Sequence, residues 1–482
     1  MRKLLLAFRS VATSGLGGDA GARWEIQSPA VYNKLIVTTL KYTPVVLAKH
    51  VPFKEANGKF KLSPANAAAT ATVQRLIKSY FVSVQALLES VASDSGIPAL
   101  AVSESARLVP WVVGNRKVAR GWVKMLLGLY ESAADEVRLA AFVALRKLAL
   151  AADHGLRESV VKGAYAGVLA CSKQNSVYTL PSLTLMKNAG SELFLLPGKA
   201  EGEMAYQLCF GFIRQLAILL RKGVKQGTKD AFKAVYNWQF VHAIDFWSLV
   251  LSGSCDKEVV AEKGESALQQ LLYPLIQVAL GAIRLVPTSR YYPFRFHLVR
   301  SLLRITQRTG TYIPLATPLF EVLASPDLSR SSKASSLKPL DFAYYLKCPA
   351  AYQKTRVYAD ALGEEAMYLL AEAYAALATS VAFPELALPA VVALKRHGKK
   401  KYQARLGAMV KTLVEKLEAQ AKWVEARREK VEFAPQRRDK VDRFLQGEPV
   451  EGTPLGGHLR LVRKLRDQKR ETLERAAQGE DI

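Results

Sequence analysis

The stretch between Glu265 and Glu321 carries side chains that could bind phosphate groups. It contains no acidic residue, and every permanently charged side chain in it is an arginine. An arginine guanidinium can hold a phosphate through two parallel hydrogen bonds, and a row of arginines without carboxylates nearby would attract a polyanion. The alternative is a solvated helix face, the commoner role for any single arginine. The six residues are Arg284, Arg290, Arg295, Arg300, Arg304 and Arg308.

Helical spacing divides these arginines into two kinds. On a helix predicted over residues 291–309, Arg300, Arg304 and Arg308 recur every four residues and form one exposed stripe opposite an apolar face. Arg295 falls within the apolar arc. It either reaches outward along its stem from the first turn or makes a buried contact to a neighbouring element.

A second basic stripe lies on the helix predicted over residues 202–222. Arg214 and Arg221 share one face of this helix, and Lys225 continues the line just beyond its end. Either stripe alone is more typical of a solvated face, but two stripes in one strongly basic chain favour phosphate contact. We therefore predict RNA or phosphate contacts at both stripes and at Arg290.

Catalytic chemistry has little support in the sequence. His242 and Asp245 lie three residues apart and would share a helix face, where they could form an acid and base pair. The aromatic residues around them favour a buried structural pair instead. The chain has no nucleophile elbow, phosphate-binding loop or zinc-protease motif, and "GLGGDAG" fails the dinucleotide-binding spacing. We expect no enzyme activity, no metal, no cofactor and no small-molecule substrate.

An aromatic helix is predicted over residues 229–251. The segment "DAFKAVYNWQFVHAIDFWSLVLSG" (230–253) is apolar nearly all round, which favours an inner layer of a helical stack. The alternative is a ridge that contacts a protein partner. The candidate partner contacts under that alternative are Tyr236, Phe240, Trp247 and Arg295.

A short basic run, "KRHGKKK", matches the pattern of a nuclear import signal. Solvated helix ends often produce the same pattern. The candidate import residues are Lys395, Arg396, Lys399, Lys400 and Lys401.

The composition indicates a folded basic protein. Lysine and arginine number 68 against 42 aspartate and glutamate, a net charge of +26, and half of the residues are hydrophobic. Such a chain can bury a large core and favours a polyanionic partner such as nucleic acid. The four cysteines are widely separated, as expected of reduced core residues in a reducing compartment. No apolar stretch is long enough to predict a membrane span.

The pattern along the chain predicts an all-α fold. Successive helices with short Gly, Pro or Ser joints are typical of a HEAT- or armadillo-like helical-repeat solenoid, although no fixed repeat period is visible. A compact irregular helical domain is the alternative. The predicted parts are a basic helix and flexible Gly-rich segment (1–27), the solenoid (28–324), a Ser-rich linker (325–340), a C-terminal helical-repeat part (341–401) and a basic, charged helical tail (402–482).

The first residues, "MRKLLLAFRSVATSG", are basic and amphipathic. Their apolar core is too short for a secretory signal. They fit either an organelle transit peptide or an amphipathic docking helix.

Several segments, in order, resemble the nucleolar complex protein 2 family. The longest, "YPLIQVALGAIRLVPTSRYYPFRFHLVRSLLRITQRTGTYIPLATPLFEVL", resembles the signature block of that family. "MKNAGSELF", "AYQLCFGFIRQLAILLR", "VYNWQFVHAIDFWSLVLS" and "TSVAFPELALPAVVALKR" resemble further parts of it. At the start, "KLLLAFRSV" and "YNKLIVTTLKYTPVVL" resemble its entry segment, so the likeness covers most of residues 1–401.

The resemblance implies a non-enzymatic scaffold of the nucleus and nucleolus. Members act in assembly of the large (60S) ribosomal subunit and rRNA processing, pair with the sister nucleolar complex proteins 1 and 3, and join pre-60S particles that contain pre-rRNA. A nuclear transport or chromatin adaptor of the helical-repeat type is the alternative. Members usually begin with a long charged extension that this sequence lacks, and the segment after Val11 is glycine-rich rather than acidic. A truncated gene model would account for the missing extension.

Overall fold

The computed structural model describes residues 1–14, 26, 28–56, 58–62, 67–91, 96–329, 333, 335–398, 404–434 and 436–478. Most of the predicted Gly-rich segment and part of the predicted Ser-rich linker lie outside these residues. The chain forms two compact units. Unit 1 comprises residues 1–172 and 181–204, and unit 2 comprises residues 173–180 and 205–482.

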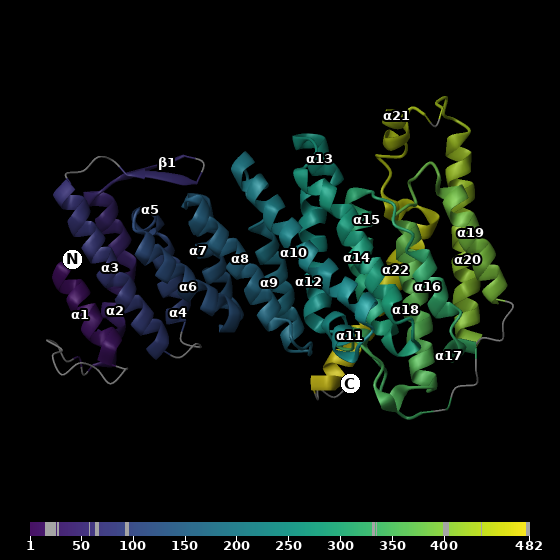
Figure 1. Ribbon diagram of the computed structural model, residues 1–482, viewed down its shortest axis with the longest axis horizontal. Helices are drawn as coiled ribbons and strands as arrows, with labels where there is room; N and C mark the ends of the chain where they lie inside the picture. The colour runs from purple at the N-terminus through teal and green to yellow at the C-terminus, as the bar shows by residue number, and fades with distance from the viewer. Residues whose placement is uncertain are drawn as a thin grey trace. The chain divides into compact units, whose positions relative to one another are not determined.

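The predicted all-α fold is confirmed (Figure 1). Unit 1 contains α1 (Arg2–Ser14), α2 (Pro29–His50), β1 (Phe53–Ala56), β2 (Lys59–Leu62), α3 (Ala67–Ser90), α4 (Ile97–Ala106), α5 (Val109–Val112), α6 (Arg116–Ser132), α7 (Asp135–Ala151) and α8 (His154–Cys171). Two helices contribute residues to both units, namely α9 (Thr179–Glu192) and α10 (Lys199–Gln226).

The remaining elements belong to unit 2. They are α11 (Lys229–Val235), α12 (Trp238–Ser254), α13 (Lys257–Lys263), η1 (Ala267–Leu271), α14 (Leu272–Leu285), η2 (Ser289–Tyr291), α15 (Tyr292–Thr309), α16 (Ala316–Leu323), α17 (Pro326–Ser329), η3 (Phe342–Tyr344), η4 (Ala350–Tyr352), α18 (Arg356–Ala375), α19 (Phe383–Gly398), α20 (Ala404–Arg428), α21 (Arg438–Arg443), η5 (Val450–Gly452) and α22 (Pro454–Gln478).

Unit 1 is built from helices that pack on their near neighbours in the chain. Helix α7 packs against α4, α6 and α8, and α1 packs against α3. The small antiparallel hairpin of β1 and β2 is the one sheet among the described residues. Packing of each helix on its near neighbours is the arrangement of a helical solenoid.

Two buried arginines of unit 1 close the ends of the preceding helices. Arg138, in the first turn of α7, donates from Nε to the carbonyl oxygen of Tyr130 in α6 at 3.0 Å. Arg157, in the first turn of α8, donates to the carbonyl oxygens of Ala149 and Ala152 at 2.7 and 3.0 Å. Because the last carbonyls of a helix have no partner within the helix, these arginines satisfy them and fix each helix on the next.

The core of unit 2 is centred on α12. Asn237 caps its N-terminus by accepting a hydrogen bond from the N–H of Phe240 at 2.8 Å. Phe246 and Trp247 are fully buried, and α12 packs closely against α15 and also against α14. The single helix predicted over 229–251 is thus two helices, α11 and α12, and the prediction of an inner layer is confirmed for α12.

The C-terminal helices pack on the rest of unit 2 rather than forming a free tail. Leu413, Leu417 and Val424 of α20 are buried, and α20 packs against α18, α19 and α22. The buried Gln420 donates to the carbonyl oxygen of Ala378 at 2.8 Å and accepts from the N–H of Leu455 at 3.2 Å. The many charged residues of these helices made their narrow apolar faces hard to recognise in the sequence. Those apolar faces attach the helices to the rest of unit 2. No helix in the described part of the chain has the length and apolar character to cross a membrane.

Candidate interaction surfaces

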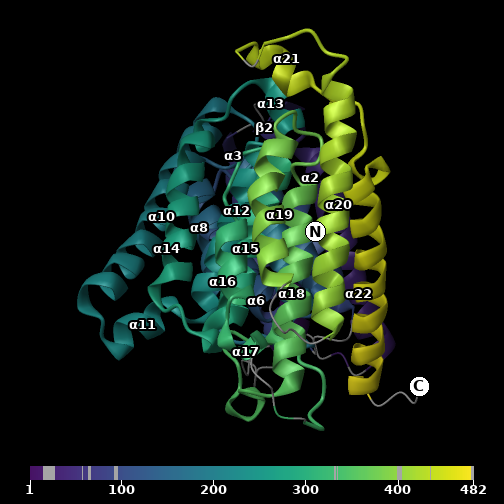
Figure 2. The same ribbon diagram turned by 90° about the vertical axis from the view of Figure 1, so that its right-hand side faces the viewer.

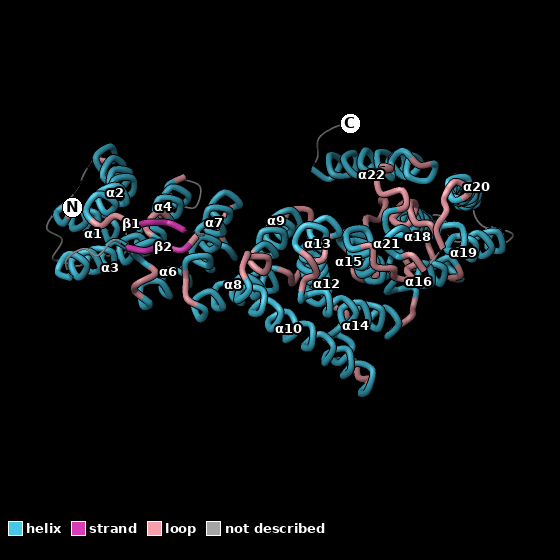
Figure 3. Tube along the Cα trace, turned by 90° about the horizontal axis from the view of Figure 1, so that it is seen from above, coloured by secondary structure: helices cyan, strands magenta, loops and turns pink. Residues whose placement is uncertain are grey.

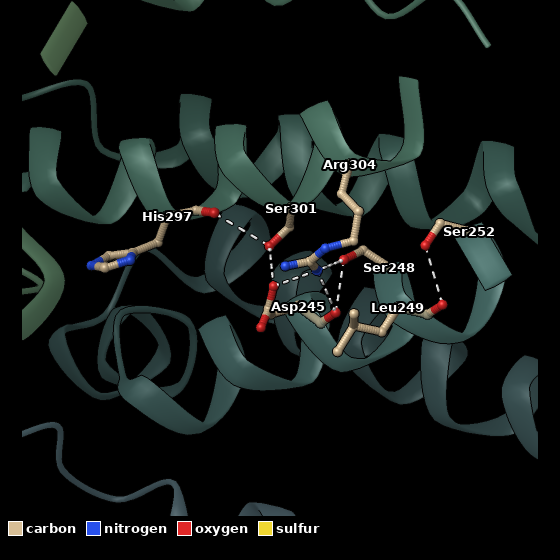
Figure 4. A network of polar contacts seen from close by, with 7 residues as sticks. All are labelled: Asp245, Ser248, Leu249, Ser252, His297, Ser301 and Arg304. Carbon is tan, nitrogen blue, oxygen red and sulfur yellow. Dashed lines mark hydrogen bonds and ion pairs between the residues drawn. The ribbon is translucent and has the colours of Figure 1, made fainter. Parts of the chain in front are cut away.

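The arginines of α15 are held by carboxylates from other helices. Arg304 donates from Nη1 to Asp245 Oδ1 of α12 at 2.7 Å and to the Ser248 hydroxyl at 2.6 Å. Ser301 donates to the same carboxylate oxygen at 3.2 Å (Figure 4). This network joins α12 and α15 side by side.

The other two members of the predicted stripe are also ion-paired. Arg300 Nη2 lies 2.6 Å from Oε1 of Glu365 on α18, and Arg308 Nε lies 2.8 Å from Oδ2 of Asp256. Side-chain exposure of Arg300, Arg304 and Arg308 is 32%, 31% and 46%. The premise that nothing nearby neutralises this stripe is wrong, because its carboxylates come from α12, the start of α13 and α18. A phosphate-binding role for these three arginines stays a prediction, but the absence of nearby carboxylates no longer supports it.

Arg295 makes the buried contact that was one of its two interpretations. It is 2% exposed and donates from Nη1 to the carbonyl oxygen of Pro318 at 2.8 Å and to Glu321 Oε2 at 2.7 Å. Arg290, in contrast, is exposed beside α15, and its carbonyl oxygen accepts from the N–H of Cys348 at 2.7 Å. Arg295 thus connects α15 to α16. Its prediction as a partner contact is wrong, because the side chain is buried.

The second predicted stripe is a free cationic surface. We define the α10–α14 surface as Arg214, Arg221, Lys222 and Lys225 of α10 together with Arg284 of α14, all exposed. None of the five has an ion-pair partner among the described residues. The sequence has no acidic residue between Glu203 and Asp230 or between Glu265 and Glu321. Lys222 and Arg284 were not among the predicted contacts. Helical phase places Lys222 beside the predicted stripe, whereas Arg284 joins it only because α14 packs against α10.

Two glycines let α10 and α14 approach closely. A Cβ atom on Gly281 would lie 2.7 Å from Cδ2 of Leu220, and one on Gly223 would lie 3.1 Å from Cδ2 of Leu285. The unit 2 part of α10 and α14 accordingly lie side by side (Figures 2 and 3). Their outer faces combine into one surface, which also exposes Ile218 by 53% and Tyr273 by 70%.

The predicted partner contacts Phe240 and Trp247 of α12 are wrong, because both side chains are buried. Phe240 and Trp247 are 2% and 0% exposed, and Trp247 stacks on Phe212 of α10. The hydroxyl of Tyr236 donates to the carbonyl oxygen of Ala282 at 3.1 Å and accepts from the N–H of Val286 at 2.8 Å. A helix that is apolar all round is surrounded by neighbours in the stack, so Phe240 and Trp247 have no free face. Tyr236 precedes α12 and is half-buried, so a partner contact there stays a prediction.

His242 and Asp245 serve as core polar groups. His242 Nε2 lies 2.8 Å from Asn175 Oδ1, while the Asp245 carboxylate accepts from Arg304 and Ser301. Both side chains are thus engaged in contacts that join elements of unit 2. No group of three His, Cys, Asp or Glu side chains within the described ranges could hold a metal ion.

The basic run predicted as an import signal is described only at its start. Lys395 pairs with Glu418 of α20, and Arg396 is exposed. Lys399, Lys400 and Lys401 lie outside the described residues. The import assignment stays a prediction.

A charged contact between α18 and α22 was not predicted. Arg463, Arg466 and Lys469 of α22 pair with Glu372, Glu365 and Glu364 of α18. Burial alone would raise the pKa of Glu365, but Arg300 and Arg466 hold that pKa below its ordinary value. In the sequence, α18 carries several acidic residues, and positions 463, 466 and 469 carry basic residues at helical spacing. The sequence alone does not show that these two helices lie together.

A sequence model described as the Noc2p family matches residues 155–462 of the chain. This range contains α10, α12, α14, α15 and α18, hence the α10–α14 surface and the α15 network. The chain belongs to the Noc2p family. The resemblance of its separate segments to the nucleolar complex protein 2 family is thereby confirmed.

Relatives of this family occur in fungi, animals and plants. An uncharacterized NOC2 family protein of Schizosaccharomyces pombe is 37% identical over 99% of this chain and 67% of its own length. Nucleolar complex protein 2 of Drosophila melanogaster is 30% identical over 89% of this chain and 55% of its own length. Nucleolar complex-associated protein 2 of Arabidopsis thaliana is 28% identical over 98% of this chain and 61% of its own length. The chain therefore spans between about half and two thirds of the length of these relatives. The fly and plant relatives are named as nucleolar complex proteins.

Proposed function

We propose that this protein is a non-enzymatic scaffold in nucleolar assembly of the large ribosomal subunit and in rRNA processing. Its family relatives from fly and plant are named as nucleolar complex proteins, which supports a nucleolar location for this member. The scaffold would bridge a partner of the same complex, in the form of the sister nucleolar complex proteins 1 and 3, and pre-60S particles.

The observation that carries this proposal is the α10–α14 surface. Its five cations are exposed and unpaired among the described residues, whereas the arginines of α15 are engaged by carboxylates. A phosphate backbone is recognised through such cations with little regard to sequence. Pre-rRNA is the polyanion of the compartment, so we assign the RNA contact of the scaffold to this surface.

Depletion of the protein from cells tests the proposal. Sedimentation of extracts should show fewer large-subunit precursor particles, and unprocessed pre-rRNA should accumulate. Re-expression of the natural chain should restore both, and the variant Arg214→Glu, Arg221→Glu, Lys225→Glu should not. Normal precursor levels after depletion would contradict a role in assembly. Rescue by the triple variant would remove the RNA contact from the α10–α14 surface.

A further inference from the structure

Helix α22 is attached to unit 2 in two different ways along its length. Its first turns are held by apolar burial, since Leu455 and Leu459 are 0% and 3% exposed. Its later turns are held by charge. Their ion pairs to α18 are Arg463 with Glu372 at 3.0 Å, Arg466 with Glu365 at 2.8 Å and Lys469 with Glu364 at 2.8 Å.

The charged turns of α22 lie over a polar cavity. This cavity has a volume of about 690 Å³, and Arg300, Glu365, Tyr368 and Arg466 are among the residues that line it. A polar space of this size admits water, which solvates charged groups on its walls. The α22 cations beside this cavity are already partly solvated, since the side chains of Arg463, Arg466 and Lys469 are 43%, 36% and 50% exposed.

Glu365 does not depend on α22 for its neutralisation. It is 4% exposed, and a buried carboxylate that loses its sole partner destabilises a fold strongly. Here Oε1 faces Arg300 at 2.6 Å while Oε2 faces Arg466 at 2.8 Å. When Arg466 leaves, Arg300 still pairs with the carboxylate, so release of α22 leaves Glu365 neutralised.

The outer face of α22 offers further cations to an approaching polyanion. Arg460 and Lys464 are exposed, and neither has a partner among the described residues. Helix α22 lies on the opposite side of unit 2 from α10 and α14 (Figures 2 and 3). A polyanion on α22 would therefore occupy a site separate from the α10–α14 surface.

We propose that the charged turns of α22 are a second RNA-binding element. In the absence of RNA, their cations are paired with the carboxylates of α18. Arg460 and Lys464 make the first contacts with RNA phosphates. The phosphates then compete with the carboxylates of α18 for Arg463, Arg466 and Lys469, because arginine binds phosphate and carboxylate through the same paired geometry. Leu455 and Leu459 keep the base of the helix in place while its later turns leave α18.

Amide hydrogen exchange of the full chain tests this proposal, with a 20-nucleotide single-stranded poly(U) RNA as the probe. Once released, an isolated turn of helix is only marginally stable, so its amides lose protection. We expect residues 463–470 to exchange on the order of tenfold faster with RNA, since each exposed ion pair contributes modestly. Residues 455–459 should not change. Unchanged or slower exchange of residues 463–470 would overturn the proposal.

Charge exchange between the two helices provides the matched variants. Glu372→Arg should speed exchange of residues 463–470 without RNA and increase RNA affinity, because the helix is released with its cations intact. Adding Arg463→Glu to that variant should restore protection. Glu372→Gln, which keeps an acceptor for the hydroxyl of Tyr368, should have a smaller effect in the same direction. Equal protection in all three variants would contradict an electrostatic attachment.

A variant of the α10–α14 surface separates the two RNA sites. Arg214→Glu with Arg221→Glu should weaken RNA binding overall but leave the response of residues 463–470 intact at saturating RNA. Loss of that response in this variant would show that α22 has no RNA site of its own.

Discussion

Nη2 of Arg300 on α15 lies 2.6 Å from Oε1 of Glu365 on α18, although 65 residues separate them in the chain. The contact turns an arginine of an acid-free segment inward and neutralises a buried carboxylate. The same two helices pack against each other in unit 2. Arg284 of the same acid-free segment, in contrast, is exposed on the α10–α14 surface without an ion-pair partner among the described residues.

Removal of the Glu365 carboxylate should destabilise unit 2 more than removal of either arginine partner. Glu365→Ala leaves Arg300 and Arg466 facing each other without a counter-charge, which should lower the free energy of unfolding by about 3–5 kcal/mol. Arg466→Ala leaves the Arg300 pair intact and should cost about 1 kcal/mol or less. Urea denaturation measures both. Equal losses in the two variants would contradict the shared-carboxylate arrangement.

The stability of unit 2 should fall in mild acid because of His297. Burial and the nearby Arg300 lower the pKa of this imidazole to about 4. The unfolded state then takes up the proton first, near pH 6.5, so stability falls as the pH decreases from about 6.5 to about 4, by roughly 2–3 kcal/mol. His297→Gln should flatten this part of the stability profile in denaturation experiments at several pH values. An unchanged slope would assign the acid sensitivity to other groups.

Charge reversal should separate the structural arginine Arg304 from the free arginine Arg221. Arg304→Glu places a carboxylate beside Asp245 and removes the donor to Ser248, so we expect a loss of about 2–4 kcal/mol in unfolding free energy. Arg221→Glu lies on an exposed face and should change stability by less than about 0.5 kcal/mol. Thermal unfolding of the two variants measures both losses of stability. Comparable losses would contradict the distinction between a structural Arg304 and a free Arg221.

The α10–α14 surface should set the salt dependence of RNA binding. The variant Arg214→Glu, Arg221→Glu, Lys225→Glu should reduce the slope of log affinity against log salt by about 2, since each contact to a single strand contributes about 0.7. Fluorescence anisotropy with a labelled single-stranded RNA gives the slope. The control is Lys411→Glu, Lys422→Glu, Lys430→Glu, three exposed lysines that share α20 and its end with acidic residues. A control slope reduced by as much would show that only net charge matters.

Helices and their buried faces were largely predictable from the sequence. Periodicity predicted the aromatic helix around Trp247 as an inner layer, and the arc position of Arg295 allowed the buried contact that the structure shows. Both inferences use spacing along one helix, which the sequence fixes directly.

Contacts between distant helices were not predictable in the same way. The carboxylates that hold Arg300 and Arg304 are Glu365 and Asp245, and no local pattern places either beside α15. The same reason hid the row of ion pairs between α18 and α22. A segment without acidic residues in the sequence can therefore still lie beside carboxylates in the structure, because neighbouring helices supply them.

Ultraviolet cross-linking of the protein to RNA within purified pre-ribosomal particles, read by mass spectrometry, tests the central claim most directly. RNA adducts should fall on peptides from residues 207–226 and 273–284, which form the α10–α14 surface. Adducts on α15, at Arg300, Arg304 and Arg308, with none on α10 or α14, would contradict the account.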